Sequence, residues 1–296
     1  MDKIGFIGVG AMGGAIAKRL IDKGFAVIAY DRNAETLMAM EAAGAEIAAD
    51  VRTIADAAEI VFACLPNAEI CRAVALGPDG VAGGGRVRIY VELSTIGGDA
   101  AIEIADALAA RGVTLIDAPV VGGTVALING TLGMLAAGPK DAFARAKPAL
   151  EAFAGRLFYL GEKAGMAQAG KVMSNAVSYA AVLSTCEAIG VGMRAGIDLE
   201  TAVAIINQGS GANFFSQQML PATVLKCVFH GTGAIETGQK DVKLFLEEAR
   251  RMGLETPMAS AVSALQKRVV ESDVPGRDTM TYVHFFTDLA GLPRLG

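Results

Sequence analysis

The sequence predicts an α/β protein in which a doubly wound parallel sheet is followed by an all-α domain. Two observations predict this fold class. Short apolar runs alternate with helical patterns over residues 1–161, as in a parallel sheet with helices on both faces. The apolar segments of residues 162–296 have helical spacing instead. A chain of 296 residues has room for two domains, and we place them at 1–161 and 162–296.

Composition and charge exclude several classes of protein. Hydrophobic residues make up 53% of the chain and charged residues 19%, with a net charge of -5, which indicates a compact core and not a disordered chain. Lysine and arginine form no cluster, so the acidic balance argues against nucleic acid or an anionic membrane as partner. The four cysteines and two histidines lack metal-site spacing. We therefore expect no metal, and reduced thiols in a cytoplasmic protein.

Three spaced glycines mark the first strand-to-helix turn. Residues 3–7 predict a buried strand and residues 12–23 a helix, so Gly8, Gly10 and Gly13 fall at the turn between them. Glycine at such a turn lets backbone N–H groups approach a pyrophosphate at the positive end of the helix. An ordinary tight turn has the same pattern, so a second signal is needed.

Asp31 supplies the second signal. It follows the predicted strand 26–30 and lies 23 residues after Gly8, where a dinucleotide-binding fold places the carboxylate that binds the ribose hydroxyls. The pair of signals favours a Rossmann-type dinucleotide site over a bare turn. The Asp31 carboxylate would repel the 2′-phosphate of NADP, so we expect NAD, while the neighbouring Arg32 leaves NADP possible.

The strand-helix alternation continues to the end of the first domain. Further strands are predicted at 60–64, 89–93, 113–116, 132–137 and 156–160, separated by helical patterns such as 99–110 and 141–153. Two strands lead into "CLPN" (64–67) and "ELST" (92–95) at the carboxyl edge of the sheet, where ligands of open α/β folds bind. Taken alone, ordinary loop chemistry explains both motifs: a proline stops a strand and a hydroxyl caps a helix.

A long apolar helix is predicted to open the second domain. Residues 164–195 contain no proline and little charge, and as one helix they would span about 48 Å. Apolar residues on all sides require burial by a second domain, a partner subunit or lipid. Glu187 and Arg194 argue against a membrane span. We expect the core helix of an all-α domain, with further helices at 201–207, 214–220, 238–252 and 257–272.

Lys171 is a charged residue on this apolar helix. A buried ammonium group is costly unless it is paired or has a task. Asn175 follows four residues later and lies on the same helix face. A lysine that extends to solvent, beside a locally bonded asparagine, explains the pair equally well.

Taken in order, these motifs resemble the β-hydroxyacid dehydrogenase family over nearly the whole chain. The matching motifs are "GVGAMG" (8–13), "STIG" (94–97), "DAPVVGG" (117–123), "GTL" (130–132), Lys171-x-x-x-Asn175 and "KD" (240–241). Members of the family include 3-hydroxyisobutyrate dehydrogenases, tartronate semialdehyde reductases and glyoxylate or succinic semialdehyde reductases. "DRN" (31–33) and "LPN" (65–67) with "AVALGPDGV" (73–81) are most similar to the tartronate semialdehyde reductase branch.

The resemblance implies an oxidoreductase that transfers a hydride between a nicotinamide cofactor and a small 3-hydroxy carboxylic acid or its semialdehyde. Lys171 would exchange a proton with the substrate oxygen, and Asn175 would orient that oxygen or the lysine. The implied substrate-binding residues are Ser94, Val121, Gly122 and Gly123, the two glycines through backbone N–H groups. The implied cofactor-binding residues are Gly8, Gly10, Ala11, Met12, Gly13, Asp31, Arg32, Leu65, Pro66, Thr95 and Lys240. The apolar second domain predicts a homo-oligomer, a dimer or a tetramer.

Departures from the family's pattern lie around the substrate. Val121 stands where the family usually has the serine of D-A-P-V-S-G-G, Ala126 and Leu127 stand where glycine and alanine are usual, and Ser174 replaces one of two asparagines. The identity of the substrate is therefore open. Two alternatives to the dehydrogenase also remain: an imine reductase-like enzyme, a class that generally lacks the lysine, and a non-catalytic dinucleotide-binding module.

Overall fold

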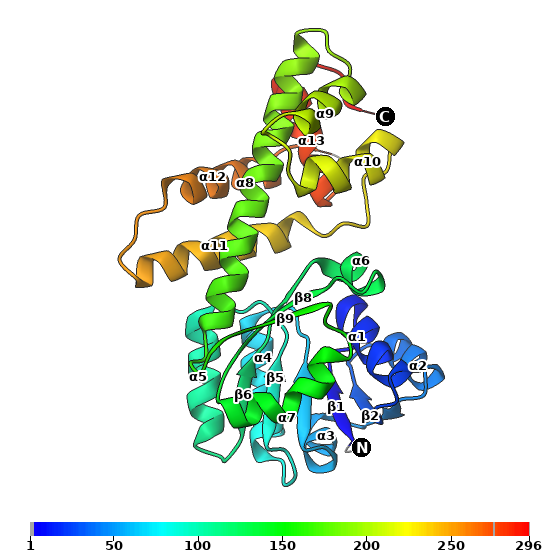
Figure 1. The fold of residues 1–296 in the computed structure, drawn as a ribbon, viewed down its shortest axis with the longest axis vertical. Coiled ribbons are helices and arrows are strands. Elements are labelled where there is room, and N and C mark those ends of the chain that lie inside the picture. Colours follow the sequence, from blue (N-terminus) through cyan, green and yellow to red (C-terminus); the bar gives the residue numbers. More distant parts are fainter. Residues whose placement is uncertain (1–2, 275, 296) are drawn as a thin grey trace. The chain divides into compact units, whose positions relative to one another are not determined.

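The computed structural model describes residues 3–274 and 276–295, which form two compact units, Met1–Lys171 and Val172–Gly296. The first unit is a nine-stranded sheet with helices on both faces (Figure 1). Its strands are β1 (Ile4–Ile7), β2 (Val27–Tyr30), β3 (Glu46–Ile47), β4 (Ile60–Ala63), β5 (Ile89–Glu92), β6 (Thr114–Asp117), β7 (Val120–Val121), β8 (Gly133–Ala137) and β9 (Arg156–Gly161). Its helices are α1 (Ala11–Asp22), α2 (Ala34–Ala42), α3 (Val51–Ala57), α4 (Ala68–Leu76), α5 (Gly98–Ala109), α6 (Gly123–Ile128) and α7 (Lys140–Glu151).

The strand order is β3-β2-β1-β4-β5-β6-β8-β7, with β9 beside β8. The strands from β3 to β6 are all parallel, which confirms the predicted fold class for this part of the sheet. The far edge of the sheet departs from this parallel arrangement, because β8 pairs antiparallel with both β6 and β7. The connection between β6 and β8 holds only the short elements β7 and α6. The chain reverses direction at α6, so β7 and β8 pair antiparallel, and β8 then lies antiparallel to β6 as well.

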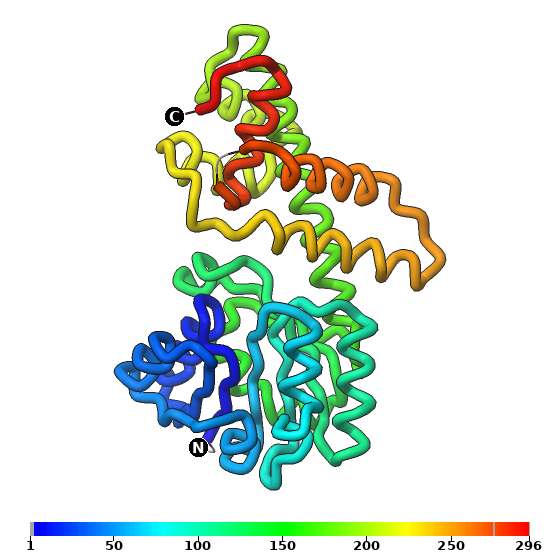
Figure 2. The backbone as a smooth tube through the Cα atoms, turned by 180° about the vertical axis from the view of Figure 1, so that it is seen from behind, coloured from blue at the N-terminus to red at the C-terminus, as the bar shows by residue number. Residues whose placement is uncertain are grey.

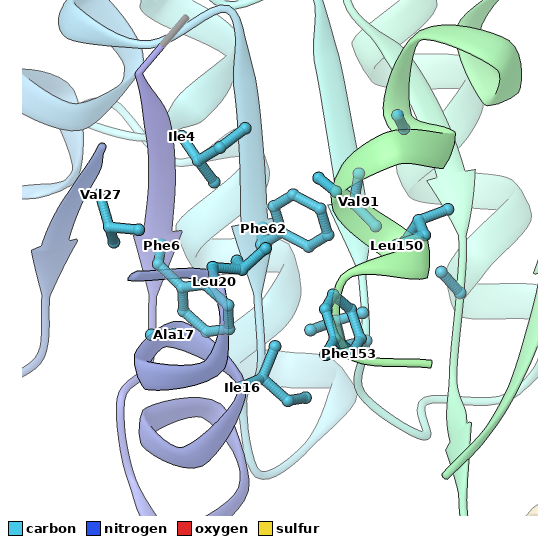
Figure 3. Packing of buried hydrophobic residues seen from close by; sticks show 14 of the residues in the cluster. Ile4, Phe6, Ile16, Ala17, Leu20, Val27, Phe62, Val91, Leu150 and Phe153 are labelled. Carbon is cyan, nitrogen blue, oxygen red and sulfur yellow. The ribbon is translucent and has the colours of Figure 1, made fainter. Parts of the chain in front are cut away.

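Alternate side chains of each strand enter two separate cores, one on each face of the sheet. Phe6 and Phe62 pack with α1, α2, α6 and α7, whereas the neighbouring Ile7 and Val61 pack with α3, α4 and α5. In the first core the rings of Phe6 and Phe62 stack at 5.9 Å, and Phe153 meets Phe62 edge-on at 6.2 Å (Figure 3). Burial on both faces makes these central strands short apolar runs, as the sequence pattern predicted.

The second unit is helical. Apart from one isolated bridge between Ala234 and Asp278, its described elements are helices. They are α8 (Met166–Arg194, whose first residues belong to the first unit), α9 (Leu199–Gln208), a π-helical turn (Phe215–Met219), α10 (Leu220–Ala222), a 3-10 turn (Val224–Lys226), α11 (Ile235–Arg251), α12 (Pro257–Val270), a second 3-10 turn (Thr279–Thr281) and α13 (Tyr282–Leu289). The helices α11 and α12 lie side by side as a hairpin (Figure 2). The core combines Cys186 and Ile189 of α8 with Val242 of α11 and Phe286 of α13.

The long helix predicted at 164–195 is a single helix, α8. By length and composition it is the one described helix that could cross a membrane, and a core helix of a soluble protein passes the same test. Part of its surface in the second unit is uncovered, since Met173, Val177 and Val191 are 59%, 68% and 68% exposed. α13 has no counterpart in the sequence prediction.

Candidate active site

The glycine turn lies where the direction of strand addition reverses. β1 pairs with β2 on one side and with β4 on the other, and ligands of such sheets bind at the carboxyl ends of these two strands. Gly8 has φ +83°, and a Cβ there would lie 2.4 Å from the Cys64 carbonyl oxygen. A Cβ on Gly13 would lie 2.0 Å from the Gly8 carbonyl oxygen. Both positions therefore require glycine for close backbone packing.

Gly10 differs, because a Cβ there would meet nothing within 4 Å. This glycine keeps open a space in front of α1, whose first residues are Ala11 and Met12. Gly10 provides no side-chain cap for α1, and the first turn of the helix carries no acidic residue. The first N–H groups of α1 thus face an open space at the positive end of a helix. A pyrophosphate fits this arrangement.

A cavity of about 800 Å³ adjoins the turn. Of the predicted cofactor residues, it is lined by Gly8, Gly10, Asp31, Arg32, Leu65 and Pro66. Apolar side chains of Val51, Ile70 and Val74 form part of its wall. A cavity that combines polar groups such as Asp31 with an apolar wall fits the adenosine half of a dinucleotide.

The Asp31 carboxylate lines this cavity and makes two hydrogen bonds to the backbone. One of its oxygens accepts a hydrogen bond from Val9 N at 2.8 Å and the other accepts one from Asn33 N at 2.9 Å. The first bond ties the end of β2 to the glycine turn. Asp31 is half-buried and Arg32 is exposed.

Cys64 and Ser94 stand at neighbouring strand ends. Burial raises the pKa of the Cys64 thiol to about 12, so this cavity-lining cysteine is a neutral thiol and no nucleophile. Ser94 is 5% exposed, and its hydroxyl oxygen accepts a hydrogen bond from Leu65 N at 2.7 Å. Ser94, predicted to bind substrate, thus holds the Leu65 backbone at the cavity. Thr95 is half-buried and does not line the cavity.

The "VVGG" segment follows β6 and forms β7 and the start of α6. Gly122 has φ +117° and Gly123 has φ +70°, and both glycines are exposed. Only glycine adopts two such conformations in succession without strain. Gly122 is the N-cap of α6 and makes no side-chain capping bond, so backbone N–H groups at this helix start are left for another acceptor such as a carboxylate. Val121 is half-buried beside them.

Lys171 and Asn175 lie on α8, four residues apart. Lys171 is half-buried, so its ammonium group loses less hydration than that of a fully buried lysine. Asn175 Nδ2 donates a hydrogen bond to Asp241 Oδ2 at 2.7 Å. Asp241 is 5% exposed, and its other oxygen lies 3.4 Å from Lys240 Nζ. The second unit therefore joins Asn175 and Lys240 through one buried carboxylate.

Three buried polar residues were not predicted as site residues: Glu92 and Asp117, which end β5 and β6, and Gln168 on α8. Glu92, Asp117 and Gln168 are each 0% exposed. Burial raises the pKa of Glu92, and it raises the pKa of Asp117 to about 6. Asp117 opens the "DAPVVGG" motif and Gln168 precedes Lys171 by three residues, but neither position reveals its bonding partners.

The turn, the cavity and Asp31 fit a nicotinamide dinucleotide, and together they define a Rossmann-type oxidoreductase. Residues 3–161 match the model of the NAD-binding domain of 6-phosphogluconate dehydrogenase. Residues 165–286 match the model for the NAD-binding region of NADP-dependent 3-hydroxyisobutyrate dehydrogenase. The chain belongs to the β-hydroxyacid dehydrogenase family, as its motifs predicted.

Individual relatives agree with this family. A 2-(hydroxymethyl)glutarate dehydrogenase from Eubacterium barkeri is 30% identical over 89% of this chain and 87% of its own. A crystal structure of 3-hydroxyisobutyrate dehydrogenase from Salmonella typhimurium superposes with a TM-score of 0.85 at 25% identity, over 96% of this chain and 100% of that one. The cytokine-like nuclear factor N-PAC of Pongo abelii is 30% identical over 95% of this chain and 52% of its own, and its name states no dehydrogenase activity.

These findings confirm the predicted class of activity. The chain is an NAD(P)-dependent hydroxyacid dehydrogenase that acts on a small carboxylate.

Proposed function

We propose that the chain interconverts a small 3-hydroxy carboxylic acid and its semialdehyde, of the 3-hydroxyisobutyrate or tartronate semialdehyde type, with NAD as cofactor. The hydrogen bond from Asn175 Nδ2 to Asp241 carries this proposal. A carboxylate accepts only, so the amide nitrogen of Asn175 must face it. With one N–H of Asn175 used by Asp241, its carbonyl oxygen and its second N–H remain for a reacting group, one helical turn from Lys171. That oxygen suits a donor, either the Lys171 ammonium or a substrate hydroxyl.

The residues of the chain have separate tasks in this proposal. The nicotinamide, when bound, supplies or accepts the hydride. The Lys171 ammonium donates a proton to the substrate carbonyl oxygen during reduction, and the neutral Lys171 amine accepts a proton from the substrate hydroxyl during oxidation. The backbone N–H groups of Gly122 and Gly123 hold the substrate carboxylate, and Asn175 fixes the direction of the proton transfer. Lys240 and Thr95 contact the cofactor.

The test combines a substrate panel with one variant. Absorbance at the NADH band is followed with 3-hydroxyisobutyrate, glycerate and the semialdehydes, and with NAD(H) and NADP(H) in turn. We expect Lys171→Ala to lower kcat by about 10²–10⁴-fold, the usual contribution of a positioned acid–base group, while NADH affinity stays unchanged. The control is Lys163→Ala, which removes an exposed lysine just before α8 and should leave kcat unchanged.

The panel also separates the alternatives. An inactive wild-type protein that still binds NADH would contradict the proposal and favour a non-catalytic binding module. Reduction of cyclic imines without turnover of any semialdehyde would favour an imine reductase-like enzyme. Full activity of Lys171→Ala would refute the proposed role of the lysine.

We also propose that the protein is a cytoplasmic homo-oligomer, with a cofactor domain at 1–161 and a substrate and oligomerisation domain at 162–296. The exposed apolar residues of α8 support the oligomer, because subunit association would cover them.

A further inference from the structure

The side chain of Gln168 makes four hydrogen bonds, all in the first unit. Its oxygen Oε1 accepts from Ile96 N at 2.9 Å and from Gly97 N at 3.1 Å. Its nitrogen Nε2 donates to the Ser94 carbonyl oxygen at 3.0 Å and to Asp117 Oδ1 at 2.7 Å. A neutral amide has two donor hydrogens and two acceptor lone pairs. All four are used, and the side chain is 0% exposed.

Asp117 completes the connection to α8 from the end of β6. Its second oxygen, Oδ2, accepts from Gly165 N at 3.0 Å and from Gln168 N at 3.1 Å. These N–H groups lie at the start of α8. N–H groups at a helix start have no acceptor within their own helix. The residues 164–167 offer no side chain that could cap them, since they are Ala, Gly, Met and Ala. A carboxylate from another element therefore caps α8.

The network continues to the cofactor cavity. Ser94 N donates to Glu92 Oε1 at 3.0 Å, and the Ser94 hydroxyl accepts from Leu65 N at 2.7 Å. A chain of hydrogen bonds thus runs from Leu65 through Ser94 and Gln168 to Asp117. It joins the carboxyl ends of β4, β5 and β6 to the first turn of α8.

We propose that Gln168 is a positioning residue for hydride transfer, which fixes Lys171 on α8 relative to the segment Ser94–Gly97. This inference rests on the proposed role of Lys171. Lys171 follows Gln168 by three residues in the same helix, so about 4.5 Å of helix axis separates the clamp from the lysine. A displacement of about 1 Å at a reacting group can cost on the order of 10²-fold in rate.

The hydrogen bond from Gln168 Nε2 to Asp117 Oδ1 offers a test, because two substitutions can exchange its donor and its acceptor. Gln168→Glu keeps an oxygen for Ile96 N and Gly97 N, but places its second oxygen against the Asp117 carboxylate and the Ser94 carbonyl. We expect kcat to fall by about ten-fold or more, with the Kd of NADH within about two-fold of wild type. In the double variant Asp117→Asn with Gln168→Glu, the new amide at position 117 donates to the new carboxylate. Its oxygen still accepts the two backbone N–H groups, so part of kcat should return.

A matched control separates positioning from stability. Gln266 on α12 is also 0% exposed, so Gln266→Glu buries the same charge in the second unit. It should lower Tm without lowering kcat at a temperature well below the transition. If Gln168→Glu fails to fold, Gln168→Met, uncharged and of similar length, is assayed instead and should show the same loss of kcat.

Each outcome decides the inference. Equal kcat for Gln168→Glu and wild type, or a double variant no better than both single variants, would overturn it. The activity of the wild-type protein is measured before that of any variant. An inactive wild type would overturn the proposed function together with this inference. An active wild type with an unaffected Gln168 variant would overturn this inference alone.

Discussion

Asp31 has two tasks at the scale of a single residue. Its carboxylate holds the glycine turn through Val9 N, and it lines the cavity in which a ribose would lie. The first task is structural and concerns the free protein. The second concerns only which dinucleotide binds.

Replacement of Asp31 should therefore change cofactor preference. We expect the wild type to prefer NAD(H), and Asp31→Ser to shift kcat/KM toward NADP(H) by about ten-fold or more, because a charged acceptor for the ribose hydroxyls is lost. The exposed Arg32 can then bind the 2′-phosphate, so adding Arg32→Ala should reverse the gain. The lost bond to Val9 N should lower the free energy of unfolding by about 1 kcal/mol. A wild type that clearly prefers NADPH would contradict this prediction.

Val121 should determine which substituent the substrate carries. It is half-buried next to the glycines proposed to bind the carboxylate, and an apolar wall there suits the methyl group of 3-hydroxyisobutyrate more than a second hydroxyl. This expectation conflicts with the similarity of "DRN" and "AVALGPDGV" to the tartronate semialdehyde branch. Asp31 of the first motif and Val74 of the second line the same cavity, so the similarity of these motifs to that branch concerns the proposed cofactor cavity.

The corresponding measurement is kcat/KM of Val121→Ser on both substrate types. A hydrogen bond between the neutral serine hydroxyl and the second substrate hydroxyl contributes roughly 0.5–1.5 kcal/mol, so the hydroxylated substrate should gain about two- to ten-fold. The methylated substrate should gain little. Val120→Ser changes the adjacent residue of β7, whose side chain points to the other face, and it should produce no such selectivity. Equal effects on both substrates would show that position 121 does not touch the substrate.

At the scale of an element, the start of α8 depends on a carboxylate from β6. Burial raises the pKa of Asp117 from 3.8 to about 6, although hydrogen bonds from Gln168, Gly165 and Ala167 oppose this shift. The pKa is higher in the folded protein than in the unfolded chain. Between about pH 4 and pH 6 the folded state therefore binds more protons, and this group's contribution to stability falls as the pH rises.

The pH dependence of the contribution of Asp117 to stability can be measured by comparison with a variant that lacks this carboxyl group. The difference in free energy of unfolding between wild type and Asp117→Asn, from urea titrations, should favour the wild type more at about pH 4 than at about pH 7. The change should be at most on the order of 2–3 kcal/mol. Burial also raises the pKa of Glu92, but both proteins retain Glu92, so its effect cancels to first order. A difference that grows with pH would contradict the assignment.

At the scale of the whole molecule, the exposed apolar residues of α8 bear on the proposed association of subunits. Met173, Val177 and Val191 lie on one face, because their spacings of four and fourteen residues are close to whole helical turns. We expect Val177→Asp with Val191→Asp to convert the oligomer to monomers in sedimentation velocity. Ser178→Asp places the same charge on an exposed residue about 100° around the helix, and it should leave the assembly intact. A wild type that sediments as a monomer would contradict the proposed homo-oligomer.

The features that could be predicted from the amino-acid sequence are local ones. The turn at Gly8, Gly10 and Gly13 was predictable because a missing Cβ is a property of each residue, and the steric contacts of Gly8 and Gly13 now account for it. Strands buried on both faces and the unbroken helix α8 were predictable because periodicity and the absence of proline act over a few neighbouring residues.

The direction of β8 and the hydrogen-bond partners of the buried polar residues depend on the tertiary structure. Gln168 meets Asp117 across 51 positions of sequence and Ile96 across 72, and Asn175 meets Asp241 across 66. A buried amide or carboxylate must find donors and acceptors to offset its lost hydration, but the sequence around it does not specify which ones. The hydrogen-bond partners of these residues are set by how the strand ends and the helix start pack together. That packing exists only in the folded chain.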